Sequence, residues 1–203
     1  MTTNTFFGSS DLDLRPARMQ RDTMHVWVQE CPGCHLVSSD LSYPEPDAVK
    51  TIARDDYQAL IEPPLPKELA GLPELANRLL RNAMFFEQDE GKFAQRVLRA
   101  AWDCDDHGLT ELANTIRKRA ANSLQRLAPF NQSSSHNSLG VLLTDILRRS
   151  GQFEKAIEHA AQMEGLEAVQ HHSYMLKVLA FQKQLCADQD AKVYTLDQAG
   201  SAS

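Results

Sequence analysis

The stretch Gly140–Met163, GVLLTDILRRSGQFEKAIEHAAQM, carries the pattern that decides the fold. Apolar residues recur at steps of three and four on both sides of Gly151, which predicts two short helices that each bury one face. Gly151 can take the left-handed conformation that ends the first helix. Arg148 and Arg149 would lie in the last turn, where the helix dipole favours positive charge, and Ser138 is the expected N-cap. We therefore predict a helical hairpin here.

The same pattern occurs sixty positions upstream, where GKFAQRVLRAAW from Gly91 aligns with GQFEKAIEHAAQ from Gly151. A glycine at the turn, an aromatic residue two positions later and small residues one turn apart resemble a tetratricopeptide (TPR) hairpin. We expect both glycines to act as pivots. The offset differs from one TPR repeat of about 34 residues, so an irregular helical bundle without true repeats is the alternative. The matched pairs are Gly91 and Gly151, Phe93 and Phe153, Val97 and Ile157, Ala100 and Ala160, and Ala101 and Ala161.

Composition excludes several classes of protein. The 203 residues are 42% hydrophobic and 24% charged, which is ordinary for a folded globular chain. The sequence contains no run of about 18 apolar residues, so it predicts no membrane span. Its first residues lack the basic start and apolar block of a secretory signal. We expect a cytoplasmic location. A net charge of −6 disfavours nucleic-acid binding, which requires a cationic surface.

The predicted fold class is mostly α: a TPR-like helical hairpin array with a small N-terminal zinc-ribbon-like β segment. Helical periodicity covers 73–89, 92–106, 109–127, 138–150, 152–164 and 167–187, with a modest helix in 47–60. We divide the chain into an irregular arm and ribbon-like segment with a CxxC (1–62), a Pro-rich linker (63–73), a TPR-like helical domain (74–190) and a polar tail (191–203).

Several charged or polar residues in the helical part have simple structural interpretations. The basic cluster of Arg117, Lys118, Arg119 and Arg126 is interpreted as a solvated helix face rather than a phosphate site. The run 103–107, DCDDH, precedes Gly108 and is interpreted as a solvated helix end. His172 is expected to face the core, and Cys104 and Cys186 are expected to be small buried hydrophobes.

The most specific motif is the run 30–35, ECPGCH, which follows the β-rich stretch His25–Gln29, HVWVQ. A strand followed by a tight Pro-Gly turn is the context in which two thiolates converge on zinc. Tetrahedral zinc needs four ligands, and no second CxxC is present in the sequence. The candidate ligands are therefore Cys31 and Cys34, with His25 and His35 as the nearest groups that could complete the set.

Other interpretations of the CxxC stay open. A thioredoxin-like redox pair needs its first cysteine at a helix N-terminus, whereas the residues after Cys34 have no helical period. The letters CxxCH also match c-type haem attachment, which normally follows export. In the simplest alternative, Cys31 and Cys34 bind nothing and only pack.

The string LDLRPARMQRDTMHVWVQECPGCHLVSSDLS (12–42) resembles an uncharacterised bacterial family, a domain of unknown function in which a zinc-ribbon-like CPxCG segment precedes TPR-like helices. The likeness continues through YQAL, LANRLL, LRAAWDCDD, LRRSGQFEKAIEH and FQKQLCADQD, and so covers most of the chain. It implies a ribbon fold with zinc as the cofactor. It implies no reaction.

The chain departs from that family in two places. The family commonly has another CxxC ahead of the stretch that corresponds to Thr2–Arg18, and the glycine usual after the second cysteine is His35 here. The expectation is that either the true start lies upstream, with a second CxxC, or the metal site has decayed. The DNA just upstream of Met1 would distinguish the two.

The leading functional hypothesis is a non-catalytic protein–protein interaction module, because helical hairpin arrays present a surface that holds a peptide or a partner helix. The expected partner is another protein or a peptide. The alternative is a metal- or thiol-dependent sensor or enzyme that uses Cys31 and Cys34. A third possibility, nucleic-acid binding through the ribbon, is disfavoured by the acidic balance. The sequence leaves the oligomeric state open.

Overall fold

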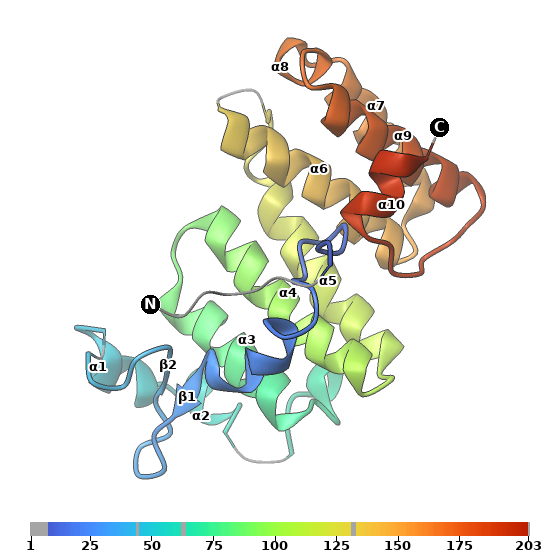
Figure 1. Ribbon diagram of the computed structural model, residues 1–203. Coiled ribbons are helices and arrows are strands. Elements are labelled where there is room, and N and C mark those ends of the chain that lie inside the picture. Colours follow the sequence, from blue (N-terminus) through green and yellow to red (C-terminus); the bar gives the residue numbers. More distant parts are fainter. Residues whose placement is uncertain (1–7, 44, 62–63, 131–132, 203) are drawn as a thin grey trace. The chain divides into compact units, whose positions relative to one another are not determined.

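The computed structural model describes residues 8–43, 45–61, 64–130 and 133–202, and the protein is mostly helical (Figure 1). The chain divides into two compact units. One unit, here called the middle unit, is Asp22–Ile116. The other, here called the terminal unit, combines Met1–Arg21 with Arg117–Ser203. None of the helices in the described ranges has the length and apolar character needed to cross a bilayer.

The middle unit is built around a helical hairpin. Its elements are η1 (Arg21–Val26, which begins at the last residue of the terminal unit), β1 (Gln29–Glu30), β2 (Val37–Ser38), α1 (Ala48–Ile52), α2 (Asp55–Gln58), η2 (Lys67–Leu69), α3 (Glu74–Phe86), α4 (Glu90–Asp106) and the start of α5 (Thr110–Gln125). Helices α3 and α4 pack together, and α3 also contacts β2. The helical period of 73–89 predicts one apolar face, with Ala76, Leu79, Leu80 and Ala83, which are buried, and Leu75 and Phe86, which are half-buried.

The predicted pivot at Gly91 is wrong. Helix α4 begins at Glu90, because the side chain of Asp89 accepts the amide of Lys92 at 2.8 Å and caps the helix before the glycine is reached. Gly91 therefore lies inside the first helical turn. Gly151 does act as predicted: it has a φ of +75° and follows the end of α6.

The predicted strand over His25–Gln29 is also mostly wrong. Residues 25 and 26 belong to the short helix η1, and only Gln29 is in a strand, opposite Ser38. The helical turn buries Met24, and it allows the indole of Trp27 to donate to the Thr23 hydroxyl at 3.0 Å. These contacts outweigh the β propensity of the stretch.

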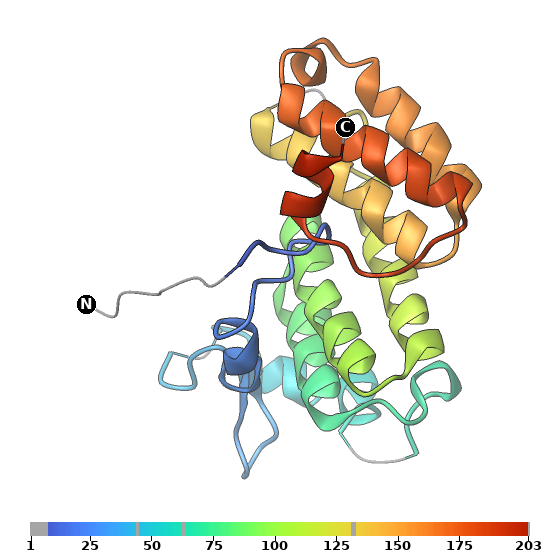
Figure 2. The ribbon, with the colours of Figure 1, turned by 45° about the vertical axis from the view of Figure 1, so that its right-hand side comes forward.

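The terminal unit contains most of α5, α6 (Ser134–Arg149), α7 (Phe153–Glu164), α8 (Glu167–Gln170), α9 (Ser173–Ala187) and α10 (Leu196–Ser201). Helices α6, α7 and α9 pack against one another (Figure 2). Helix α6 starts before the predicted N-cap Ser138, because the side chain of Ser133 accepts the amide of His136 and caps it earlier.

Two inward-facing predictions in the terminal unit fail. The predicted helix over 167–187 is interrupted between α8 and α9, and His172 at the break is exposed rather than in the core. The apolar face predicted for the helix after Gly151 includes Ala156, Ala160 and Ala161. Ala156 and Ala160 are fully buried as expected, whereas Ala161 of α7 is exposed. The buried face of α7 is therefore narrower than the apolar face that the sequence pattern predicted.

The predicted polar tail carries an ordered element. Thr195 caps α10 through a reciprocal capping box with Gln198, and Ala199 is fully buried. Asp11 and Thr195 form an antiparallel bridge, in which the Leu12 amide donates to the Tyr194 carbonyl at 2.8 Å. The two ends of the described chain are thus joined within the terminal unit.

The predicted linker does not coincide with the division between the units. Within the described part of that linker, Leu69 is almost fully buried, while Glu62 and Pro63 lie outside the described residues. The amide side chain of Asn77 donates to the Leu60 carbonyl at 2.8 Å, so the segments before and after the prolines are held together.

Candidate functional site

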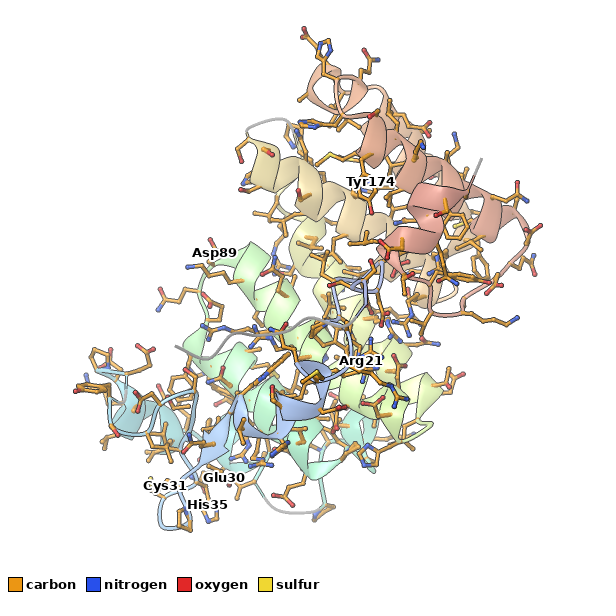
Figure 3. The ribbon with its side chains drawn as sticks, viewed as in Figure 1. Arg21, Glu30, Cys31, His35, Asp89 and Tyr174 are labelled. Carbon is orange, nitrogen blue, oxygen red and sulfur yellow. The ribbon has the colours of Figure 1, made fainter. Side chains whose placement is uncertain are left out.

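The CxxC lies in the turn between β1 and β2 (Figure 3). The amide of His35 donates to the Cys31 carbonyl at 2.9 Å, and the amide of Cys31 donates to the Leu36 carbonyl at 2.9 Å, which closes the turn. His35 has a φ of +58°, in the left-handed region that a glycine most easily adopts. The turn therefore keeps, with a histidine, a conformation that normally selects glycine.

The surroundings of the Cys31 sulfur favour its thiolate form. The backbone N–H of Gly33 is the main cause that lowers the pKa of the Cys31 thiol, followed by the N–H of Cys34 and the thiol of Cys34. Both cysteines lie in the one turn that the bond from the His35 amide closes. Cys34 is exposed and Cys31 is half-buried, so the pair faces solvent.

A network of hydrogen bonds fixes the exit of this turn to α2 and α3. The carbonyl of His35 accepts the hydroxyl of Tyr57 at 2.7 Å and Nη1 of Arg81 at 3.0 Å. Glu30 bridges the two sides: its Oε2 lies 2.6 Å from Nη2 of Arg81, and its Oε1 lies 2.9 Å from Nδ1 of His35. Arg81 is in turn oriented by Asn77, whose Oδ1 accepts its Nε at 2.7 Å.

Each predicted histidine ligand has a partner at Nδ1. His25 is exposed in η1, with Nδ1 3.0 Å from the Asp22 carbonyl, and Nδ1 of His35 is bound to Glu30. Within the described ranges, no three His, Cys, Asp or Glu side chains are grouped as metal ligands would be. Zinc in a structural site takes four ligands, and the turn supplies two of them, Cys31 and Cys34, so zinc binding stays a prediction.

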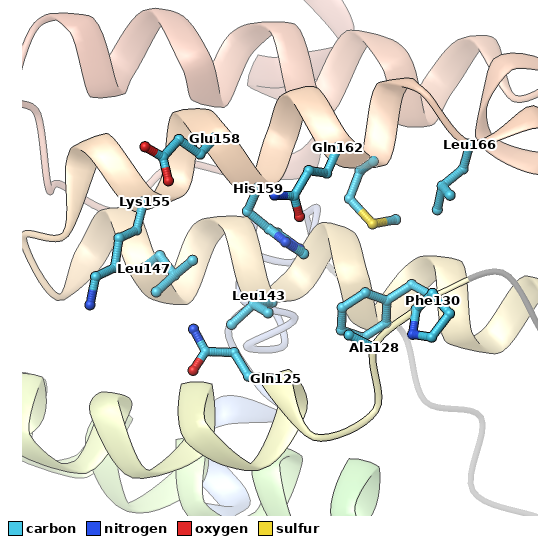
Figure 4. A pocket seen from close by; sticks show the side chains of 12 residues that line it. Gln125, Ala128, Phe130, Leu143, Leu147, Lys155, Glu158, His159, Gln162 and Leu166 are labelled. Carbon is cyan, nitrogen blue, oxygen red and sulfur yellow. The ribbon is translucent and has the colours of Figure 1, made fainter.

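A separate groove of about 630 Å³ lies in the terminal unit (Figure 4). It is bounded by the end of α5 and the loop after it, by α6 and by α7. Its lining residues are Gln125, Ala128, Pro129, Phe130, Leu143, Leu147, Lys155, Glu158, His159, Gln162, Met163 and Leu166. The floor is apolar, while lysine, glutamate and glutamine side chains lie at the edge.

The groove is shaped by a close approach of α6 to Met163 and Phe130. A Cβ built on Gly140 would lie 2.5 Å from the Met163 sulfur and 3.0 Å from Phe130 Cγ, so only glycine fits there without movement. Nε2 of His159 donates to the Gly140 carbonyl at 2.9 Å, and its ring packs edge-on against Phe130. Burial lowers the pKa of His159, and the bond to Gly140 opposes this.

This groove was not predicted from the sequence. One wall of the groove is formed by residues 128–130, which fold back over α6 and α7. The path of such a loop cannot be predicted from hydrophobic periodicity. The only usable signal was the spacing along α7, where 155, 158, 159, 162 and 163 repeat at steps of three and one and include apolar and polar side chains.

The basic cluster was misassigned in part. Arg117 is almost fully buried, at 1% exposure, and its Nη2 lies 3.9 Å from the Asp13 carboxylate. Arg149, also buried, pairs with the same carboxylate. Arg148 is fully buried and binds Asp145 at 2.6 Å. Of the predicted cluster, Arg117 is therefore a core group, whereas Lys118 and Arg126 are exposed as expected. Arg148 and Arg149, which lie outside that cluster, are core groups of the same unit.

The remaining candidates are structural. Asp103 of the DCDDH run is buried, and its carboxylate accepts the Ala76 amide at 2.9 Å, whereas Asp106 and His107 are exposed as expected. Cys104 and Cys186 are buried, as predicted. Burial raises the pKa of the Cys186 thiol to about 11.

Comparisons with family models, with curated proteins and with solved structures found no match to this chain. The resemblance to a ribbon-and-TPR family stays a prediction.

Proposed function

We propose that the chain is a non-catalytic protein–protein interaction module, built on TPR-like helical hairpins, that holds a peptide of a partner protein in the groove along α7. The observation that carries the proposal is the continuous lining along one face of this helix. Lys155 and Met163 are eight residues apart, so the lined face extends for about 12 Å at ~1.5 Å per residue. That length matches roughly four residues of extended peptide.

The chemistry of the groove supports a peptide as the occupant. An apolar floor with a polar edge is the usual anatomy of a recognition surface, where apolar anchors are buried and the rim stays hydrated. Met163 supplies an adaptable side chain at the floor. Lys155 and Glu158 at the edge offer both signs of charge to a partner.

The test is selection of 12-residue peptides from a display library on the immobilised full chain. Ala128 is an exposed lining residue, so Ala128→Trp fills the groove without disturbing the core. We expect the selected peptides to bind this variant at least about tenfold more weakly, the loss of one good anchor.

The matched control is Ala161→Trp, because Ala161 is equally exposed on α7 but does not line the groove. It should bind the selected peptides like the wild type. Failure to enrich any peptide, or equal weakening by both variants, would contradict the proposal.

The second candidate is a thiol- or metal-dependent sensor that uses Cys31 and Cys34. Two observations favour it: one closed turn holds both cysteines, and backbone N–H groups, that of Gly33 first, lower the pKa of the Cys31 thiol. Such donors stabilise a thiolate, the reactive form of cysteine. Alkylation of the full chain with iodoacetamide at pH 7, followed by peptide mass analysis, should modify Cys31 well before the buried Cys186. Equal or slower modification of Cys31 would remove this candidate.

A further inference from the structure

The donor set in the β1–β2 turn contains two neighbouring thiols. Among the described residues, no further His, Cys, Asp or Glu side chain groups with them as a metal ligand would, and Glu30 is occupied by Arg81 and His35. A tetrahedral zinc ion would need two further ligands. A soft monovalent cation with a filled d shell, such as Cu(I), prefers thiolates and is satisfied by two of them.

We propose that Cys31 and Cys34 form a two-coordinate site for Cu(I). This inference rests on the second of the two functions proposed above and names the ligand for it. Binding converts two thiols and one Cu(I) into one bis-thiolate complex with a single negative charge, and it releases two protons. Copper stays in the +1 state, so no oxidant or reductant is needed.

The turn is built before the cation arrives. The amide of His35 donates to the Cys31 carbonyl and the amide of Cys31 donates to the Leu36 carbonyl, each at 2.9 Å, so one closed turn holds both cysteines. The backbone N–H groups of Gly33 and Cys34 also favour the thiolate of Cys31. The backbone donors remain when the Cys34 proton is released, and they offset the negative charge of the complex.

The frame behind the turn is rigid. The His35 carbonyl is held by Tyr57 and Arg81, and Arg81 also binds Glu30 at 2.6 Å. Pro32, Gly33 and Cys34 are exposed, so a cation can enter directly from solvent or from another thiol ligand. A fixed frame with an open face suits a site that exchanges its cation.

The test is titration of the reduced full chain with Cu(I), without oxygen and with bicinchoninate as the competing chelator. We expect one equivalent of Cu(I) per chain. Cys31→Ser and Cys34→Ser should each weaken binding by more than about 100-fold, because loss of a supporting residue alone costs 10–100-fold. Cys186→Ala, which removes a thiol outside the turn, should leave the affinity unchanged.

A second measurement does not depend on the folding of the variants. In the wild type, bound Cu(I) should protect Cys31 and Cys34 from N-ethylmaleimide. Uptake below a tenth of an equivalent, or equal affinity in the serine variants, would overturn the site. Binding of one zinc per two chains, with dimer formation, would also overturn it in favour of a shared four-thiolate site. Rapid iodoacetamide modification of Cys31 without Cu(I) uptake would contradict the copper site but would still support the thiol sensor.

Discussion

His159, which lines the groove, makes the free energy of unfolding depend on pH. Burial lowers its pKa below the ordinary value of 6.5, so the folded chain favours the neutral imidazole that donates to Gly140. The unfolded chain takes up this proton first as the pH falls through about 6.5, and the free energy of unfolding therefore decreases below that pH.

His159→Gln should reduce this acid sensitivity. Between pH 7.5 and 5.5, we expect the urea midpoint of the variant to fall less than that of the wild type. His171→Gln, at an exposed position, is the control and should follow the wild type. Parallel decreases in wild type and His159→Gln would show that burial of this imidazole has no thermodynamic consequence.

At the scale of residues, the partners of the buried arginines could not be predicted from the sequence. Arg148 and Arg149 were placed correctly at the end of a helix, but each also has a partner far along the chain. Arg149 pairs with Asp13, and Nη1 of Arg148 donates to the Lys192 carbonyl at 2.9 Å. A local pattern predicts the charge of a residue and the helical face on which it lies. It does not predict an ion pair with a carboxylate from the other end of the chain.

At the scale of elements, the turn between α6 and α7 depends on one glycine. Gly151 has a φ of +75°, and an added Cβ would meet no atom within 4 Å, so the cost of alanine there is backbone strain alone. We expect Gly151→Ala to lower the free energy of unfolding by about 1–2 kcal/mol. Denaturant unfolding measures this.

Gly165 at the other end of α7 is the matched control. Its φ is −74°, and an added Cβ would lie 3.4 Å from the Gln162 carbonyl oxygen, which is ordinary contact. Gly165→Ala should change stability by less than about 0.5 kcal/mol, as surface substitutions usually do. Equal losses at both glycines would mean that the left-handed turn is not the source of the effect.

Helices were predictable because their periodicity is a local signal, and α3, α4, α6 and α7 all occur near the expected positions. Their ends were less predictable. Gly91 and Gly151 align in the sequence, yet only Gly151 ends a helix, since Asp89 caps α4 first. The CxxC turn was expected, whereas its attachment to Tyr57 and Arg81 depends on contacts across more than twenty residues.

At the scale of the molecule, the terminal unit is assembled from both ends of the sequence. Residues 10–12 bind residues 194–196 through backbone hydrogen bonds, and Leu12 and Ala199 belong to one apolar cluster. No composition shift marks this arrangement, because the joining residues are separated by most of the chain. A linear division into arm, linker, helical domain and tail therefore could not describe the two units.

The Asp13 carboxylate tests whether the N-terminal segment holds the terminal unit together. It is buried against Arg149 and Arg117, so Asp13→Ala should leave buried positive charge and cost about 3–5 kcal/mol. Hydrogen exchange should then accelerate by at least about 100-fold in the most protected amides of α6 and α9. Amides of α3 and α4 in the middle unit should keep their rates. The exposed substitution Glu154→Ala should change neither set. Faster exchange in both units of Asp13→Ala would instead mean that they unfold as one, since only the terminal unit contains the lost ion pair.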